Sequence, residues 1–281
     1  MKLKIGQLNE LQVVRKTDIA YLLKNKSDEE VFLHLNESNH RKLEPGQYVE
    51  AFLYFDAKGR LAATLHEPYI TEGNPGILKV VAVKPGLGVF LDLGISKDVL
   101  LSKDDLPNDE SLWPMVDDRV LVDLKIKTKM TARPIPYNEI RLVTGNLNIG
   151  DEVSGFVQVI GNIGYFILTD EYNLILVKRS NVRKAYRLGE ALNVKITYET
   201  PNGYEGSLID FKEVIRVDDS KLIMDYLISQ GGHMPYTATT DSDTIQKVFG
   251  LSRKSFKRAL GLLYKERKVV FEENETVVVK S

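Results

Sequence analysis

The sequence contains no cysteine, and its 281 residues include only four histidines and one tryptophan. The absence of cysteine excludes disulfides, thiolate metal sites and cysteine nucleophiles. The histidines, His34, His40, His66 and His233, show no spacing typical of metal ligands, and they are too few for most acid–base active sites. We therefore expect no enzymatic activity, no cofactor and no metal site.

Long apolar runs and a large net charge are also missing. No apolar segment approaches the length that spans a bilayer, and the N-terminal residues MKLKIGQLNE lack the apolar core of a signal peptide. These features predict a cytoplasmic protein without a membrane partner. The formal net charge is −1, so any surface that binds nucleic acid must consist of local basic patches.

Common catalytic signatures are absent as well. The sequence has neither a Walker phosphate-binding loop nor a GxSxG nucleophile motif. The acidic pairs Asp104–Asp105 and Asp117–Asp118 are typical of turns rather than of metal ligands. A nuclease, which needs clustered carboxylates, is therefore a distant alternative.

What is present suits several small β domains. Hydrophobic residues make up 43% of the chain and charged residues 27%, as in soluble globular proteins. Short strand-like runs separated by glycine-rich turns recur in three similar sets, the clearest of which spans residues 76–107. The repeat predicts three five-stranded antiparallel barrels of the OB class, at residues 1–68, 74–136 and 149–213.

The strands expected in each barrel follow from these runs. They are 11–14, 19–23, 31–35, 47–55 and 61–65 in the first copy, 77–83, 89–93, 99–101, 120–126 and 130–135 in the second, and 155–160, 165–168, 174–177, 191–198 and 204–209 in the third.

The apolar period changes near residue 218, where helical spacing begins. Helices are predicted at 221–230, 242–249 and 252–268, followed by a hairpin with strands 269–271 and 276–279. Three helices and a hairpin indicate a winged helix at residues 218–281.

One aromatic side chain in the second strand of each copy is a candidate platform for a nucleobase. Alternation along 89–93 directs Phe90 away from the apolar side, and Tyr21 and Phe166 hold the corresponding positions at similar spacing. An exposed ring on the sheet of an OB barrel can stack on a base. Alternation alone leaves open the other interpretation, in which these rings fill the barrel cores.

Two basic segments could supply phosphate contacts. Residues 178–187 contain no acid and five cations, namely Lys178, Arg179, Arg183, Lys184 and Arg187. The aromatic residue Tyr186 lies in the same segment. A solvated loop is the alternative explanation for this run.

On the third C-terminal helix, cations lie on or beside the face opposite the apolar stripe, where a recognition helix carries phosphate contacts: Lys254, Lys257, Arg258 and Lys265. Any amphipathic helix has a charged outer face, however, and winged helices also serve as protein-contact modules. The acidic residues of the predicted wing, Glu272, Glu273 and Glu275, would repel phosphates.

The segment Gly86–Leu93, GLGVFLDL, is similar to the Gly-x-Phe-Val strand of S1 RNA-binding domains. Three S1-like copies followed by a winged helix resemble the bacterial RNA-binding family called conserved virulence factor B. The segments 111–114, 187–190 and 249–261 are further family-like stretches, and the resemblance covers essentially the whole chain.

The resemblance implies a binding face made of two aromatics around the second strand, a His in the third, and an Asp and an Arg flanking the last hairpin. In the first copy Tyr21, His34, Asp56 and Arg60 match four of these positions. Phe90 and Phe166 match the second aromatic in the other copies, where Leu87 and Ile163 replace the first. Ser102 and Lys178 take the place of the His.

The sequence thus predicts a mainly β protein, with three S1-like barrels and a C-terminal α+β winged helix, that binds single-stranded RNA. The resemblance implies that it regulates gene expression post-transcriptionally. A DNA-binding regulator acting through the winged helix and a protein-interaction scaffold are the alternatives. The sequence does not specify the oligomeric state.

Overall fold

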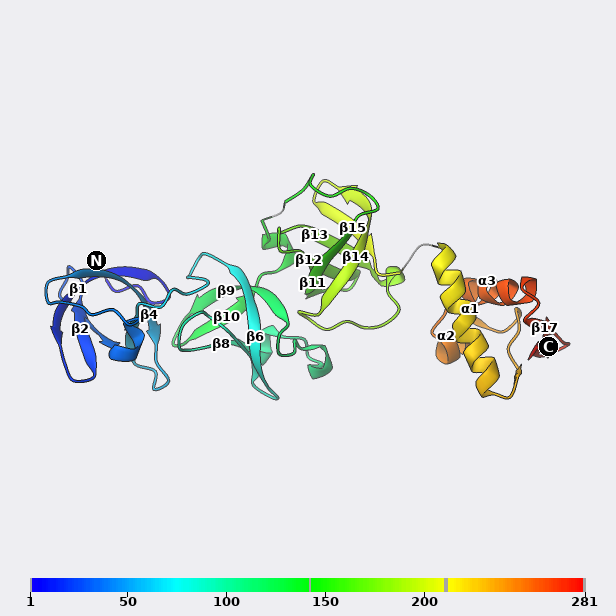
Figure 1. The fold of residues 1–281 in the computed structure, drawn as a ribbon, viewed down its shortest axis with the longest axis horizontal. Helices are drawn as coiled ribbons and strands as arrows, with labels where there is room; N and C mark the ends of the chain where they lie inside the picture. Colours follow the sequence, from blue (N-terminus) through cyan, green and yellow to red (C-terminus); the bar gives the residue numbers. More distant parts are fainter. Residues whose placement is uncertain (1, 142, 210–211, 280–281) are drawn as a thin grey trace. The chain divides into compact units, whose positions relative to one another are not determined.

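The structure is a computed structural model that describes residues 2–141, 143–209 and 212–279 (Figure 1). The predicted domain limits at residues 1 and 281 lie outside these residues. The chain divides into two compact units, one of residues 1–179 with 184–206 and one of residues 180–183 with 207–281.

The first unit holds three closed five-stranded barrels with the same strand order, in which the fifth strand lies between the third and the fourth (Figure 1). The first barrel consists of β1 (Leu8–Lys16), β2 (Ala20–Lys24), β3 (Glu30–His34), β4 (Tyr48–Phe55) and β5 (Leu61–Thr64). The second consists of β6 (Gly76–Lys84), β7 (Gly88–Leu91), β8 (Val99–Ser102), β9 (Arg119–Ile126) and β10 (Met130–Pro134). The third consists of β11 (Glu152–Ile160), β12 (Gly164–Leu168), β13 (Leu174–Lys178), β14 (Ala191–Thr200) and β15 (Gly203–Ser207).

The predicted barrels are confirmed, with one difference in how they close. In each barrel the third and fifth strands pair in parallel, as at Phe32 opposite Ala62, whereas the sequence suggested antiparallel pairing throughout. The fifth strand runs antiparallel to the fourth. Its other edge pairs with the third strand, which runs in the same direction, and this parallel pair closes the barrel.

Inward-facing side chains fill the barrels, as period-two alternation requires. Leu11, Leu23, Leu33 and Leu53 are buried together in the first barrel. The first strand of every barrel contains an irregular register, between Val13 and Arg15 in β1 and at corresponding places in β6 and β11. Such β-bulges bend a strand and help a short sheet to close.

Within residues 2–141 and 143–209, five short 3₁₀ helices connect the strands: η1 (Leu35–Glu37), η2 (Lys103–Asp105), η3 (Glu110–Leu112), η4 (Tyr137–Glu139) and η5 (Arg179–Asn181). The side chain that opens η1, His34, accepts a hydrogen bond from the backbone N–H of Asn36. Ser102 does the same for Asp104 at the start of η2. The two turns therefore occupy equivalent places in their barrels.

The second unit is a winged helix, as predicted. Its elements are α1 (Lys212–Ser229), β16 (His233–Met234), α2 (Ser242–Phe249), α3 (Arg253–Lys265), β17 (Val269–Phe271) and β18 (Thr276–Val278). The sheet has the order β16-β18-β17, and β16 was not expected from the sequence. Asp241 and Ser252 cap α2 and α3 through their side chains, and Gly250 ends α2 in a left-handed conformation.

The apolar stripe of α3 forms the core of this unit, where Phe256 and Leu260 are buried beside Ile223 of α1. Among the described residues, we find no helix with the length and apolarity needed to cross a membrane.

Candidate nucleic-acid interface

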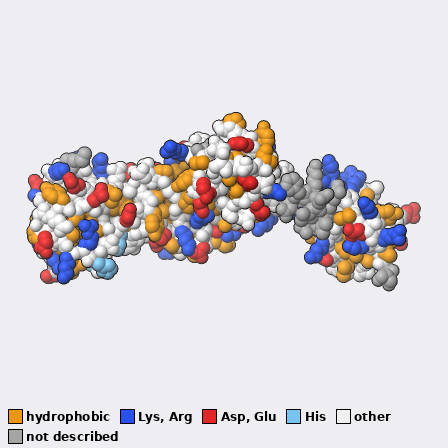
Figure 2. All heavy atoms as spheres, turned by 45° about the horizontal axis from the view of Figure 1, so that its top comes forward, with side chains coloured by type: hydrophobic (Ala, Val, Ile, Leu, Met, Phe, Trp, Pro, Cys, Tyr) orange, Lys and Arg blue, Asp and Glu red, His pale blue; other side chains and the backbone are white. Residues whose placement is uncertain are grey.

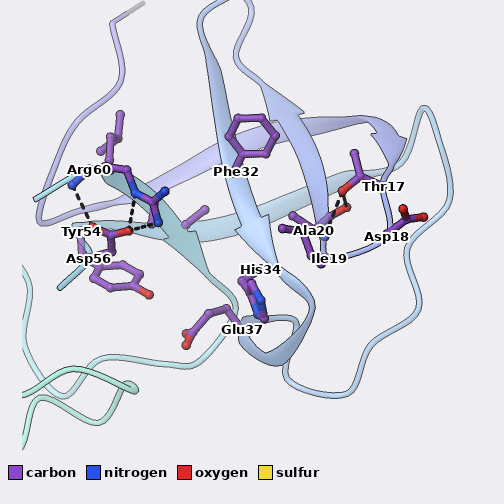
Figure 3. A pocket seen from close by; sticks show the side chains of 13 residues that line it. Thr17, Asp18, Ile19, Ala20, Phe32, His34, Glu37, Tyr54, Asp56 and Arg60 are labelled. Carbon is purple, nitrogen blue, oxygen red and sulfur yellow. Dashed lines mark hydrogen bonds and ion pairs between the residues drawn. The ribbon is translucent and has the colours of Figure 1, made fainter. Parts of the chain in front are cut away.

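A pocket of about 800 Å³ opens on the first barrel (Figure 3). One side is formed by the segment Thr17–Ala20, which leads into β2, and the other by the end of the hairpin between β4 and β5 (Figure 3). Phe32 of β3 and Glu37 of η1 lie between them. This volume is in the range of sites that hold small ligands.

Two large apolar side chains are exposed at this pocket. The ring of Phe32 is 55% exposed, and Ile19 just before β2 is exposed as well. Large apolar side chains left in solvent beside a hollow are characteristic of binding surfaces. These two side chains can therefore pack against a flat ring of a ligand.

The far side of the pocket carries an ion pair at the predicted Asp and Arg positions. Nε and Nη2 of Arg60 donate to Oδ2 of Asp56 at 2.8 and 2.7 Å. Hydrogen bonds from the backbone and the side chain of Arg60 lower the pKa of Asp56, so this carboxylate stays ionised. The guanidinium of Arg60 remains largely exposed to solvent and accessible to an anion.

His34, the third predicted residue of this face, also lines the pocket. Its Nδ1 accepts from the backbone N–H of Asn36 at 3.2 Å, an interaction that requires a neutral ring with its proton on Nε2. His34 is 22 residues before Asp56, and Arg60 follows Asp56 by four. All three line one pocket, as the resemblance implied.

Glu37 and Tyr54, which the sequence did not single out, line the same pocket. Glu37 is only 8% exposed, and its Oε2 is buried without a hydrogen-bond partner among the described residues. Burial raises the pKa of the Tyr54 phenol, so this side chain stays protonated. In Figure 3 the Glu37 carboxylate and the Tyr54 hydroxyl extend toward the same part of the pocket.

Tyr21 does not belong to this face, and its predicted exposure is wrong. The side chain is 3% exposed within the core of the first barrel, and its hydroxyl accepts from the backbone N–H of Leu43. Tyr165 of the third barrel is buried in the same way, and its hydroxyl accepts from the N–H of Tyr186. Tyr21 therefore corresponds to Tyr165, not to Phe166.

The strand pairing explains this error. Ala20, Gly88 and Gly164 open the second strands, and they lie opposite His34, Ser102 and Lys178, the last residues of the third strands. Tyr21 is one residue after Ala20, whereas Phe90 and Phe166 are two residues after Gly88 and Gly164. An offset of one residue moves a side chain to the other face of a strand.

Phe32 has the exposed position that was expected for Tyr21. The position equivalent to Phe90 and Phe166 is Leu22 in the first barrel, and Leu22 pairs directly with Phe32. In the other barrels the second strand carries the phenylalanine and the third strand the leucine, with Phe90 opposite Leu100 and Phe166 opposite Leu176. Alternation with His34 in the run VFLHL was the signal that could have identified Phe32.

The aromatic rings of the other two barrels are less accessible. Phe90 is half-buried, and Nζ of Lys84 lies 5.3 Å from the centre of its ring. Phe166 is only 8% exposed, because Tyr137 of η4 stacks on it with ring centres 4.5 Å apart and planes 6° from parallel. The exposed platform expected at Phe166 is thus covered by a residue from the preceding linker.

The basic run 178–187 does not form an open cluster of cations. Acids outside the run pair with four of its cations: Lys178 with Glu205, Arg183 with Asp219, Lys184 with Glu190, and Arg187 with Asp118. The side chains of Lys178 and Lys184 are 50% and 66% exposed, whereas their partners Glu205 and Glu190 are more buried. Both lysines thus reach the solvent, where an ion pair is weak.

Arg179, Tyr186 and Arg187 are structural in this arrangement. Nη1 of Arg179 donates to the Tyr165 hydroxyl at 3.1 Å, and Tyr186 is buried edge-on against Tyr165. Arg187 donates to Asp118 of the second barrel at 2.8 and 3.0 Å, which fastens the third barrel to the second.

Cations gather on the outer face of α3 in the winged helix. Arg253, Lys254, Lys257 and Arg258 line a shallow hollow, and three of these four residues were predicted as phosphate contacts. The fourth predicted residue, Lys265, lies in the last turn of α3. Figure 2 shows basic and acidic side chains interspersed on the visible face of the barrels. The hollow on α3, in contrast, is lined by cations.

Within the described residues, His, Asp and Glu side chains form no group of three or more that could hold a metal ion.

Comparisons with known proteins assign the family. An S1 domain model matches residues 5–66, a model for the CvfB first S1-like domain matches 76–132, and a CvfB-like winged helix model matches 221–277. The chain is 30% identical over 284 residues to conserved virulence factor B of Staphylococcus epidermidis, covering 98% of this chain and 95% of that protein. The chain belongs to the conserved virulence factor B family.

Two further relatives match nearly the whole chain. Conserved virulence factor B of Staphylococcus aureus is 30% identical, and the match covers 94% of that protein. Uncharacterized protein YitL of Bacillus subtilis is 32% identical over 275 residues, with 96% of this chain and 91% of that protein covered. The resemblance drawn from the sequence is therefore confirmed.

A solved structure shares the fold. It is the crystal structure of a multidomain protein with nucleic acid binding domains from Streptococcus pneumoniae, with a TM-score of 0.62 and 24% identity. The match covers 98% of each chain, so the likeness of fold extends over nearly the whole length of both.

Proposed function

We propose that this chain binds single-stranded RNA through the pocket face of its first barrel and thereby regulates gene expression post-transcriptionally. The observation that carries the proposal is the exposed ring of Phe32 beside His34, Asp56 and Arg60 in one pocket. OB-type barrels bind oligonucleotides on this part of the sheet, and the streptococcal protein of the same fold is described as having nucleic acid binding domains.

The proposed binding combines stacking with phosphate contact. A base stacks on Phe32 and is covered by Ile19, an arrangement worth about 1–3 kcal/mol per base in single-strand-binding proteins. The exposed guanidinium of Arg60 contacts a backbone phosphate. Oxygens of Asp56 and Nε2–H of His34 can hydrogen-bond to a ribose 2′-hydroxyl, the group that distinguishes RNA from DNA.

The other barrels add weaker contacts along the same strand. Phe90 with Lys84 offers half a platform and a cation, and Lys178 and Lys184 lie at the surface of the third barrel. Several weak sites on one chain raise the total affinity when the strand can reach them together.

A second candidate function is binding of duplex DNA through α3. It is favoured by the four cations that line one hollow of this helix, since recognition helices of winged helices contact phosphates from this position. The acids Glu272, Glu273 and Glu275 beside β17 act against it because they repel the backbone.

Titration of the full chain with fluorescently labelled single-stranded RNA, single-stranded DNA and duplex DNA, each at two salt concentrations, tests the proposal. We expect the tightest binding to single-stranded RNA, with affinity that falls as salt rises. Tightest binding to duplex DNA would favour the α3 alternative. Absence of binding to all three would favour a protein-interaction scaffold.

A further inference from the structure

The strongest feature of the pocket that stacking and phosphate contact do not use is Glu37. Its carboxylate lines the pocket, is more than nine-tenths buried, and has an Oε2 without a hydrogen-bond partner among the described residues. A buried polar atom in this state is costly unless a ligand supplies the missing bond. The position of Glu37 therefore indicates what kind of ligand fits.

An ionised carboxylate only accepts hydrogen bonds, so its ligand must present donors. Arg60, the cation that lines the pocket, is held by Asp56 on its far side. The described residues provide no group of ligands for a metal ion, which makes a bound cation a poor candidate. The apolar side chains Ile19, Phe32 and Leu61 instead form walls suited to a flat ring that carries N–H groups on its edge.

Only one of the four RNA bases presents two adjacent donors on its pairing edge. Guanine offers N1–H beside the exocyclic N2 amine, and the two oxygens of a carboxylate can accept both bonds. Adenine and cytosine each place one amine beside an acceptor, which a carboxylate repels, and uracil places a single N–H between two carbonyl oxygens. Reading of a base edge by paired hydrogen bonds is a common basis of selectivity.

We propose that the pocket of the first barrel selects guanine through the carboxylate of Glu37. The base stacks against Phe32 and directs its N1–H and N2 amine to Glu37. The inference rests on the proposed binding of single strands and adds a base preference to it.

The test uses the full chain and labelled uridine dodecamers that carry guanosine, inosine or adenosine at one central position. Inosine keeps N1–H and lacks the N2 amine. Fluorescence anisotropy should show binding to the guanosine strand about tenfold tighter than to the adenosine strand, with inosine between them. Because this series needs no variant, it does not depend on the folding of a mutant.

The variant Glu37→Gln replaces one acceptor oxygen by an amide NH₂ donor of about the same size. It should weaken binding of the guanosine strand to the level of the adenosine strand. Glu50→Gln is the matched control, because Glu50 is an exposed acid on β4 of the same barrel and should keep the preference.

Two results would overturn the inference alone: equal affinity for the guanosine and adenosine strands, or a preference that survives Glu37→Gln. If none of the strands bound, the proposed function would fail, and the inference would fail with it.

Discussion

At the scale of single residues, the proposed interface depends most on Phe32. Phe32 and Tyr48 are two exposed aromatic residues of the first barrel, at 55% and 56% exposure, but Phe32 lines the pocket and Tyr48 begins β4. Phe32→Ala should weaken binding of single-stranded RNA by about 1–3 kcal/mol, since a stacked base is lost. Tyr48→Ala is the control and should change the affinity little. Equal losses in the two variants, measured by anisotropy, would refute the role of Phe32.

We expect Glu37 to lower the stability of the first barrel against unfolding. Glu37→Gln removes a buried charge that has an oxygen without a described partner, so we expect the free energy of unfolding of the first barrel to rise by about 1 kcal/mol. Native-state hydrogen exchange of the barrel amides measures this change without assuming that the whole chain unfolds in one step. Lower protection in the variant would mean that Glu37 stabilises the barrel instead.

At the scale of elements, the second strand of a barrel lies very close to the third. A Cβ added to Gly88, at the start of β7, would lie 2.1 Å from the carbonyl oxygen of Leu101, and the residue has φ of +140°. Gly88→Ala should therefore lower the unfolding free energy of the second barrel by at least about 1–3 kcal/mol.

Hydrogen exchange of the amides of β7 and β8 checks this expectation. Gly261→Ala in α3 is the control, because that position has open space for a Cβ and a helix gains about 0.5–1 kcal/mol from the change. Similar protection of β7 in Gly88→Ala and the unmodified chain would contradict the close approach.

The elements were predictable from sequence because their signals are local. Turn residues such as the Asn202–Gly203 pair and alternation between apolar and polar positions marked most strand ends to within a few residues. The face of a given side chain was less predictable. Tyr21 was placed one residue out of register, because Ala20 stands where the other barrels have the glycine that marks the start of the strand.

Partners that come from distant parts of the chain were beyond the reach of sequence patterns. Nothing near Phe166 indicated that Tyr137 would cover it, and nothing in the run 178–187 indicated that Asp118 would hold Arg187. Such contacts depend on how the barrels pack, which periodicity within a strand does not encode.

At the scale of the whole molecule, the second and third barrels are joined by a buried amide. The side chain of Gln158 accepts from the N–H of Leu121 at 2.8 Å and donates to the carbonyl oxygens of Leu121 and Ile135. Gln158→Leu leaves these backbone groups without that partner and should destabilise the junction by about 1–3 kcal/mol.

Faster hydrogen exchange at Leu121 and at neighbouring amides of β9 would show the loosened junction. The control, Gln12→Leu, removes an exposed hydrogen bond from the corresponding strand of the first barrel and should leave β9 unaffected. Unchanged exchange at Leu121 in Gln158→Leu would show that the Gln158 amide is not needed to hold these two barrels together.

The most direct test of the central claim is a map of chemical-shift changes in the full chain on titration with single-stranded RNA. The account predicts the largest changes at the pocket of the first barrel, at Ile19, Phe32, His34, Glu37 and Arg60. Changes confined to the winged helix or to the third barrel, with the first barrel unaffected, would contradict it.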